Sequence, residues 1–340
     1  MAKILVTGGT GYIGSHTAVE LIEDGYEVII VDDLSNSQTD VLDGIEGITG
    51  VRPDFEEFDL CDRQKVFALF EKYAIDAIIH FAALKAVGES VEKPLEYYHN
   101  NTESLINLLL AMKESGASSF VFSSSCTVYG QPDELPVTEK APIKKAMSPY
   151  GNTKQIAEEI IQDAIHAIPS IKAIALRYFN PVGAHRSALI GELPLGVPQN
   201  LVPFVTQTVA GLREKLRVFG NDYNTPDGTA IRDYIYVGDL ARAHVVAVQR
   251  MLSNRNKKNF EVFNLGTGKG ISVMEIVKTF EEATGQKVNY EIAGRREGDI
   301  EKVWADTRFA NDELGWIAST PLDETLRTAW EWEKRLRNIS

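Results

Sequence analysis

A glycine-rich turn between a short apolar run and an amphipathic stretch constrains the fold more than any other feature of this chain. Residues 8–14 read Gly-Gly-Thr-Gly-Tyr-Ile-Gly and directly follow the apolar run Ile4–Thr7. Glycine lets the backbone turn tightly and approach a pyrophosphate closely, and the positive end of the following helix favours the anion. Glycine turns alone are a weak signal because they serve many strand–helix corners. The context on both sides, however, predicts a strand–turn–helix unit that binds a dinucleotide.

The first half of the chain alternates short β-branched apolar runs with amphipathic stretches. This rhythm predicts βαβ units and a parallel sheet buried on both faces. The expected strands are Ile4–Thr7, Val28–Asp32, Phe55–Phe58, Ala77–Phe81, Phe120–Ser123 and Ala173–Arg177. Three helices have clear ends: Ser15–Asp24 stops at Gly25, Pro94–Ser115 stops at Gly116, and Pro149–Ala167 stops before Pro169. Such a sheet places its ligands at the carboxyl ends of its strands.

The pattern becomes irregular after about residue 180, where residues 181–203 are rich in proline and glycine. Helices are expected at Val202–Glu214, Asp239–Leu252, Val273–Ala283 and Leu322–Arg337. The sequence therefore predicts an α/β protein: a Rossmann-type doubly wound parallel sheet over residues 1–180 and a smaller mixed α/β C-terminal substrate lobe over residues 181–340. Some elements should be interleaved between the two parts, and a ligand should lie in the cleft between them.

The composition indicates a folded protein with an acidic surface. Of 340 residues, 44% are hydrophobic, and 35 Lys and Arg against 48 Asp and Glu give a net charge of −13. This charge repels nucleic-acid backbones and anionic membranes, so neither is an expected partner. Two distant cysteines, Cys61 and Cys126, suit a reducing cytoplasm. The N-terminal apolar run is too short for a leader or a membrane span, and no metal site is expected.

An acidic pair closes the second expected strand. Asp32 and Asp33 follow Gly14 at about the spacing of the carboxylate that binds the adenosine ribose hydroxyls in dinucleotide-binding folds. Two acids with no arginine nearby would repel a 2′-phosphate, so NAD is favoured over NADP as the cofactor.

Tyr150 and Lys154 lie one helical turn apart at the start of a predicted helix. A tyrosine has a free pKa of about 10, so service as a base near neutrality requires a nearby cation. Lys154 can supply that charge. A surface pair without a role is the commoner explanation of an isolated YxxxK pattern, but it loses weight beside a dinucleotide turn. Ser125 closes the fifth strand and is interpreted as a third member, whereas Ser123 and Ser124 are expected to form a turn.

These motifs together resemble the extended short-chain dehydrogenase/reductase superfamily. The residues concerned are the GxxGxxG turn, Asp32, Phe81-Ala82-Ala83, Ser125 and YxxxK. Further stretches are similar to the UDP-glucose 4-epimerase family within it: Lys85–Ser90, Arg177–Pro181, Gly220–Tyr223, Asp227–Thr229, Arg232–Tyr234 and Gly294–Asp299. The similarity runs from residue 4 to about residue 335, and its C-terminal motifs are the more selective ones.

The resemblance implies an NAD-dependent enzyme that interconverts UDP-galactose and UDP-glucose through a transient 4-keto sugar, as a cytoplasmic homodimer built on the Pro94–Ser115 and Pro149–Ala167 helices. The implied catalytic residues are Tyr150, Lys154 and Ser125. Implied cofactor contacts are Gly8, Gly11, Tyr12, Ile13, Gly14, Asp32, Asp33, Asn36, Ser37, Asp59, Leu60, Phe81, Ala82, Ala83, Lys85, Asn101, Tyr150, Lys154 and Tyr178. Implied substrate contacts are Lys85, Ser125, Tyr150, Phe179, Asn180, Asn200, Leu201, Phe219, Arg232, Tyr234, Arg296, Asp299 and Val303.

Alternatives remain open at this point. Arg232 could pair with Asp233 or Asp239, Phe219 could be core, and Asp299 could cap a turn. A nucleotide-sugar 4,6-dehydratase needs an Asp-Glu pair where this chain has Cys126 and Thr127, and a non-catalytic dinucleotide sensor would have no use for Tyr150. Val303 stands where some family members have a tyrosine, so N-acetylated UDP-hexoses are also candidate substrates.

Overall fold

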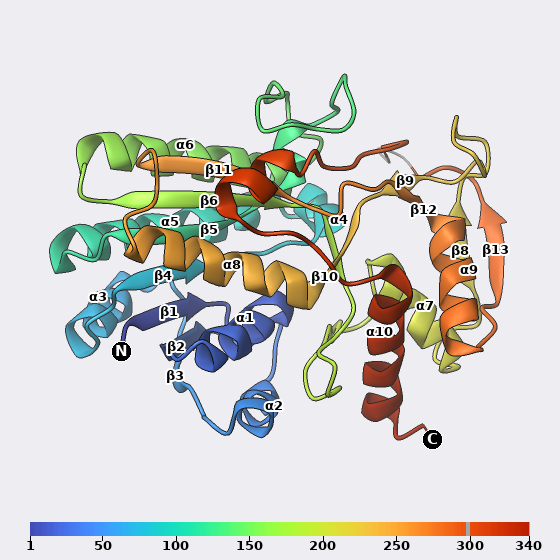
Figure 1. Ribbon diagram of the computed structural model, residues 1–340, viewed down its shortest axis with the longest axis horizontal. Helices are drawn as coiled ribbons and strands as arrows, with labels where there is room; N and C mark the ends of the chain where they lie inside the picture. The colour runs from blue at the N-terminus through green and yellow to red at the C-terminus, as the bar shows by residue number, and fades with distance from the viewer. Residues whose placement is uncertain (297–299, 340) are drawn as a thin grey trace.

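Parallel strands form the central sheet of the computed structural model, which describes residues 1–296 and 300–339 (Figure 1). The strands are β1 (Lys3–Thr7), β2 (Glu27–Asp32), β3 (Asp54–Glu57), β4 (Ala77–His80), β5 (Ser119–Ser125), β6 (Lys172–Tyr178) and β11 (Phe260–Leu265). They lie in the order β11-β6-β5-β4-β1-β2-β3, and all neighbours are parallel. The order reverses between β1 and β4, where doubly wound sheets bind their ligands. The predicted Rossmann-type class is confirmed.

Helices cover both faces of this sheet. They are α1 (Tyr12–Glu23), α2 (Asp40–Thr49), α3 (Arg63–Lys72), α5 (Pro94–Ser115), α6 (Pro149–Ala167) and α8 (Val237–Leu252), and the short helix α4 (Val87–Glu92) packs against α5 and α6. Successive strand residues point to opposite faces: Ile4 and Val6 pack with α1, α2 and α8, whereas Leu5 packs with α3, α5 and α6. The near-continuous apolar strands of the sequence are thus explained by burial on both faces.

The remaining elements form a smaller group beside the sheet (Figure 1). They are β7 (Asn180–Val182), α7 (Leu201–Val209), β8 (Leu216–Phe219), β9 (Ile231–Arg232), β10 (Tyr234–Tyr236), β12 (Ile271–Ser272), α9 (Val273–Thr284), β13 (Tyr290–Ala293) and α10 (Leu322–Arg337). Helices α7, α9 and α10 share one apolar cluster with β8. Two short helical turns, η1 (Cys126–Tyr129) and η2 (Ala310–Leu314), complete the elements of the described residues. None of the helices so described is long and apolar enough to cross a bilayer.

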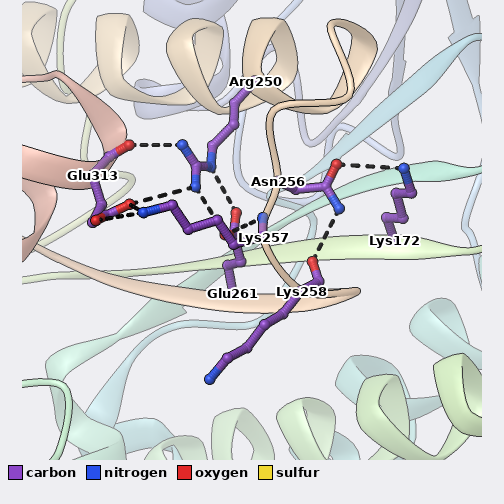
Figure 2. A network of polar contacts seen from close by, with 7 residues as sticks. All are labelled: Lys172, Arg250, Asn256, Lys257, Lys258, Glu261 and Glu313. Carbon is purple, nitrogen blue, oxygen red and sulfur yellow. Dashed lines mark hydrogen bonds and ion pairs between the residues drawn. The ribbon is translucent and has the colours of Figure 1, made fainter.

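The chain returns from the smaller group to the large sheet through α8 and β11. A buried ion pair holds this return: the guanidinium of Arg250 on α8 donates to both carboxylate oxygens of Glu261 on β11, at 2.7 and 2.9 Å (Figure 2). Arg250 also donates to the Glu313 carbonyl on η2, and Lys257 donates to the Glu313 carboxylate. The network joins three elements at the edge of the sheet.

The structure corrects several local expectations. The helix expected over Ser15–Asp24 begins at Tyr12 and ends at Glu23. The helix expected over Val202–Glu214 ends at Val209, because the chain turns away through Gly211 with a φ of 80°. Ser123 and Ser124 do not form a turn. They lie within β5, whose pairing with β6 continues to Ser125 opposite Tyr178.

Candidate functional site

The glycine turn lies at the carboxyl end of β1 and leads into α1. Gly8 has a φ of 68°, and its amide donates to the Val31 carbonyl at 2.7 Å. A Cβ on Gly14 would overlap the Gly8 carbonyl oxygen and come within 2.8 Å of the Gly9 Cα. Gly11 caps α1 without a side chain. Main-chain N–H groups at a helix N-terminus are thus left for a ligand, which is the arrangement that binds a phosphate group.

Asp32 joins the end of β2 to this turn. Its carboxylate accepts hydrogen bonds from the Thr10 amide at 3.2 Å, the Leu34 amide at 3.1 Å and the Ser37 hydroxyl at 3.0 Å. Thr10 lies inside the glycine turn, so acid and turn form one unit. The Asp33 carboxylate accepts hydrogen bonds from the amide and the hydroxyl of the neighbouring Ser35. A glycine cradle with an acid at its side fits NAD.

The segments after β3 and β4 border the same edge of the sheet. A Cβ on Gly8 would come within 2.8 Å of the Ala82 amide, so Phe81, Ala82 and Ala83 begin against the glycine turn. Asn101 on α5 binds both the amide and the carbonyl of Leu84, at 2.8 and 3.0 Å, which fixes the segment that carries Lys85. Asp59 and Leu60 follow β3, where the Asp59 carboxylate accepts the Cys61 amide.

The side chains of Tyr12 and Ile13 point away from the glycine turn into protein contacts. The Tyr12 hydroxyl donates to the Gly183 carbonyl at 2.5 Å, so the ring connects the start of α1 with the chain after β7. Ile13 packs against the apolar cluster on the α1 side of the sheet. The main chain of these two residues therefore forms part of the turn, while the contacts of their side chains fix the turn in place.

Tyr150, Lys154 and Ser125 are brought together where β5 ends beside the start of α6. The helix begins with Pro149 in its first turn and is capped by Ser148, whose hydroxyl accepts the Gly151 amide. The Lys154 ammonium donates to the Ser123 carbonyl at 2.7 Å and lies 6.0 Å from the centroid of the Tyr150 ring. Lys154 is only 5% exposed.

Burial controls the acidity of these groups. Desolvation raises the pKa of Tyr150 well above its ordinary value, the nearby Tyr178 adds to this, and a hydrogen bond with Ser125 opposes it. Desolvation lowers the pKa of Lys154 to about 8, against the attraction of Glu158. The phenol therefore needs the positive charge of Lys154, and of any bound cation, before it can release its proton near neutral pH.

Tyr178 and Ser123 add a second hydroxyl pair at this edge. The Ser123 hydroxyl and the Tyr178 hydroxyl lie 2.7 Å apart, and burial raises the pKa of Tyr178 to about 12. Ser124 points to the opposite face of β5, where its hydroxyl donates to Glu158 at 2.5 Å. The serine run is thus a strand end, with Ser123 and Ser125 on one face and Ser124 on the other.

The residues expected at the substrate fall into two groups. Phe179 and Val303 are buried in one cluster with the half-buried Cys126, next to Ser125, and the Asn180 amide donates to the Asp233 carbonyl. The other group lies in the smaller part of the molecule. Asn200 begins α7 and donates to Glu192 at 2.6 Å, with Leu201 after it, while Phe219 at the end of β8 has the Arg296 guanidinium 5.8 Å above its ring. Asp299 lies outside the described residues.

The structure bears on two alternatives raised above: that Arg232 pairs with Asp233 or Asp239, and that Phe219 is a core residue. Arg232 lies in β9 and Tyr234 in β10. The carboxylate of Asp233 is buried and accepts the amides of Thr267, Gly268 and Ala305. Phe219 is 38% exposed and so is not an ordinary core residue.

Three residues with contacts at the site were missed. Thr153 donates to the Tyr150 carbonyl and accepts from Asn101, Glu192 accepts from Asn200, and Glu158 accepts from Ser124. Polar residues in an amphipathic helix or a proline-rich loop look the same in sequence whether they face solvent or a buried partner. For Glu158, the spacing of four residues from Lys154 was the available signal.

Comparisons with known proteins identify the family. The sequence profile of the GDP-mannose 4,6 dehydratase family matches residues 5–329. A UDP-glucose 4-epimerase of Erwinia amylovora is 48% identical over 333 residues, which make up 98% of each chain. The chain belongs to the UDP-glucose 4-epimerase family. The resemblance drawn from the motifs is confirmed, together with the extended short-chain dehydrogenase/reductase fold that it implied.

Solved epimerase structures extend this likeness to three dimensions. The UDP-glucose 4-epimerase from Stenotrophomonas maltophila, with bound NAD and formylated UDP-arabinopyranose, superposes with a TM-score of 0.96 at 48% identity and full coverage of both chains. The epimerase from Bifidobacterium longum, in complex with NAD⁺ and UDP, gives a TM-score of 0.94 at 45% identity, again with full coverage. Among the described residues of the present family member, no three His, Cys, Asp or Glu are grouped to hold a metal ion.

Proposed function

We propose that this protein is an NAD-dependent epimerase that interconverts UDP-galactose and UDP-glucose, with Tyr150 as the base. The observation that carries the proposal is the meeting of Tyr150, Lys154 and Ser125 at the sheet edge that also holds the glycine turn and Asp32. Bound NAD would supply hydride acceptance and return at C4 of the sugar. The solved relatives that carry NAD support this cofactor.

The residues of the chain divide the work of proton transfer. Tyr150 accepts the proton of the sugar 4-hydroxyl as a 4-keto sugar forms, and returns it when the sugar is reduced on its other face. Lys154 lowers the energy of the phenolate by its charge, and Ser125 bonds to the phenol oxygen. The net redox change is zero, so the cofactor needs no exchange between turnovers.

The sugar must turn between the two hydride transfers, so anchoring has to come from the nucleotide rather than the hexose. We assign the diphosphate to Arg232 and Arg296, whose guanidinium groups form paired hydrogen bonds with phosphate oxygens. Phe219 would contact the base, since its ring lies under Arg296. Asn180 lies at the start of β7, and Asn200 precedes the first residue of α7.

A 4,6-dehydratase is the nearest competing function, and the matching family carries that name. Elimination of water from C5 and C6 needs an acid and a base beyond the tyrosine. The chain has Cys126, Thr127 and Val128 after Ser125, and burial raises the pKa of the Cys126 thiol to about 12. This position therefore offers no proton donor and acceptor pair, which favours return of the hydride to C4. In a non-catalytic dinucleotide sensor, Tyr150, Lys154 and Ser125 would have no role.

The deciding experiment is incubation of the purified protein with UDP-galactose, without added cofactor, followed by separation of the UDP-hexoses. We expect UDP-glucose and UDP-galactose at equilibrium. A 4-keto-6-deoxy product would support the dehydratase, and unchanged UDP-galactose would contradict both enzymes.

The protein is expected to purify with NAD already bound, because the glycine cradle and Asp32 form one unit and the reaction cycle never needs to exchange the cofactor. Acid extraction followed by chromatography measures the nucleotide and its amount per chain. NADP in the extract, or a protein active only with millimolar added cofactor, would count against this prediction.

We also propose that the hexose pocket admits a 2-acetamido group, since Val303 is smaller than tyrosine. Val303 packs with Phe179 beside Cys126, at the place where Ser125 closes β5. The native protein should then epimerise both UDP-galactose and UDP-N-acetylgalactosamine, and Val303→Tyr should slow the second far more than the first. Comparison of kcat/KM for the two substrates tests this. Equal slowing of both would show that Val303 is ordinary core, with the epimerase assignment intact.

A homodimer through α5 and α6 is the expected assembly. These helices pack against each other, and Val91 and Leu95 nearby are 63% and 81% exposed. Large exposed apolar side chains in adjacent turns favour contact with another protein surface. Light scattering coupled to size exclusion should give twice the chain mass of 37.7 kDa. We place the protein in the cytoplasm, where its two free thiols would stay reduced.

A further inference from the structure

Glu158 is a buried carboxylate that the proposed reaction leaves without a role. It lies on α6 one turn beyond Lys154, which itself lies one turn beyond Tyr150, so the three side chains follow one face of the helix. Glu158 is only 4% exposed. A carboxylate at such a position is retained only with charged or hydrogen-bonding partners, because burial without them is costly.

Its partners come from two neighbouring strands. Glu158 accepts the Ser124 hydroxyl at 2.5 Å and both Nε and Nη2 of Arg177, at 2.9 and 2.5 Å. Ser124 on β5 and Arg177 on β6 are paired across the sheet, so one carboxylate holds both strands against α6. The Arg177 guanidinium also lies 4.8 Å from the Tyr129 ring centroid. The Glu158–Arg177 ion pair is buried inside the protein and lies close to the carboxyl ends of β5 and β6.

The residues on either side of Ser124 belong to the proton-transfer group. The Ser123 carbonyl accepts the Lys154 ammonium at 2.7 Å, and Ser125 forms the hydrogen bond that favours the Tyr150 anion. A strand residue fixed on one face fixes the positions of its two neighbours on the other. We propose that Glu158 is a positioning residue: it pins the end of β5 to α6 through Ser124 and supplies the negative charge that keeps Lys154 an ammonium ion. The inference rests on the proposed epimerase function.

The charges around Lys154 make the electrostatic half of this role measurable. The attraction of Glu158 opposes the desolvation of Lys154, as does the hydrogen bond to the Ser123 carbonyl, and the pKa of Lys154 lies at about 8. The other ionisable groups near the strand ends are His80 on β4, Tyr97 on α5, Cys126 in η1, Tyr150 on α6, and Arg177 and Tyr178 on β6. Burial lowers the pKa of His80 to about 3, while it raises those of Tyr97, Tyr150, Cys126 and Tyr178; Arg177 stays cationic. Lys154 is therefore the group that titrates just above neutrality.

Glu158→Gln tests the inference. It keeps a hydrogen-bonding side chain of the same size but removes the charge, so the pKa of Lys154 falls and the ammonium is lost at lower pH. We expect the alkaline limb of kcat for UDP-galactose to move down by about one pH unit, the shift typical of one close charge, with KM nearly unchanged. Titration of Lys154 by NMR, in protein labelled at the lysine Cε and assigned with Lys154→Met, should move by the same amount.

Glu261→Gln is the matched control. Glu261 is also a buried carboxylate in a two-point ion pair with an arginine (Figure 2), but it lies near the amino end of β11, whereas Glu158 contacts residues near the carboxyl ends of β5 and β6. Both variants should lower Tm, since each removes the carboxylate that a buried guanidinium binds at two points. Only Glu158→Gln should move the alkaline limb. A merely structural Glu158 would make the two variants alike.

The double variant Glu158→Gln/Arg177→Met serves if the single one does not fold, because it leaves no unpaired guanidinium. The alkaline limb of kcat in the double variant should still move to lower pH, since the anion that raises the pKa of Lys154 is gone. A folded Glu158 variant with the wild-type limb and the wild-type Lys154 titration would overturn the inference while leaving the epimerase assignment standing. A wild-type protein without epimerase activity would instead contradict the proposed function, and the NMR titration would still report on Glu158.

Discussion

Tyr150→Phe should lower kcat for UDP-galactose by about a thousand-fold, within the range typical of losing a positioned acid–base group. The substitution removes one oxygen and nothing else. Without it, the proton of the sugar 4-hydroxyl has no acceptor within the group of Lys154 and Ser125. The nucleotide anchors and the glycine turn are untouched, so copurified NAD and the affinity for UDP should stay within about twofold of wild type.

Tyr98→Phe is the matched control for this loss. Tyr98 lies on α5 next to α6, and its hydroxyl accepts a hydrogen bond from Asn152 at 2.7 Å. The same atom is removed from a neighbouring helix, at the cost of one hydrogen bond worth about 1 kcal/mol. Its kcat should remain close to that of wild type. Near-normal turnover of Tyr150→Phe would overturn the assignment of the base, and an equal loss in both variants would point to damage of the α5–α6 packing.

Helices α5 and α6, which begin at a proline, were predicted to the residue, whereas α1 begins at Tyr12 rather than at Ser15. Pro94 lies in the first turn of α5, where its missing N–H costs nothing, and Gly116 ends the helix with a φ of 82°. The same reasoning placed α6 between Pro149 and Ala167. It failed at α7, because the turn at Gly211 comes before the apolar pattern fades.

The partner of β6 could not be read from local sequence. β11 pairs with β6 from Ala173 to Tyr178, although β7, α7, β8, β9, β10 and α8 lie between the two strands in the sequence. Its residues Phe260–Leu265 resemble an isolated strand of any sheet, and only the packing of α8 and the Arg250–Glu261 ion pair bring it to this edge. Pairing between distant segments depends on what the intervening chain does, which periodicity does not encode.

The candidate site also contains both residues that local spacing identifies and residues that only contacts between distant segments bring together. The glycine turn and Asp32 lie at the ends of β1 and β2, and Tyr150 and Lys154 lie one turn apart at the start of α6, so local spacing was enough to recognise each pair. Glu158 was not recognised in this way, because a glutamate in an amphipathic helix usually faces solvent. Its burial follows from the ion pair with Arg177. That arginine lies on β6, which comes after α6 in the sequence.

Gly14→Ala should abolish retention of NAD, with the copurified cofactor falling by at least about tenfold, equivalent to 1.4 kcal/mol or more of binding free energy. Helix propensity alone predicts the opposite sign for stability, since alanine gains about 1 kcal/mol over glycine inside a helix. At Gly14, however, the new Cβ overlaps the Gly8 carbonyl oxygen, and main-chain atoms cannot move aside as a flexible side chain can. The turn itself must shift, and overpacking of this kind costs about 1–3 kcal/mol.

Gly47→Ala separates these two effects. Gly47 lies inside α2, is exposed, and its Cβ would meet only the end of the Leu189 side chain, at 3.4 Å. Propensity should therefore act alone there, raising Tm slightly and leaving the NAD content at the wild-type level. Thermal unfolding and extraction of the bound nucleotide, measured on both variants, compare the same added methyl group in two helices. If Gly14→Ala kept its cofactor and gained stability as Gly47→Ala is expected to, the glycine turn would not be the surface against which the pyrophosphate rests.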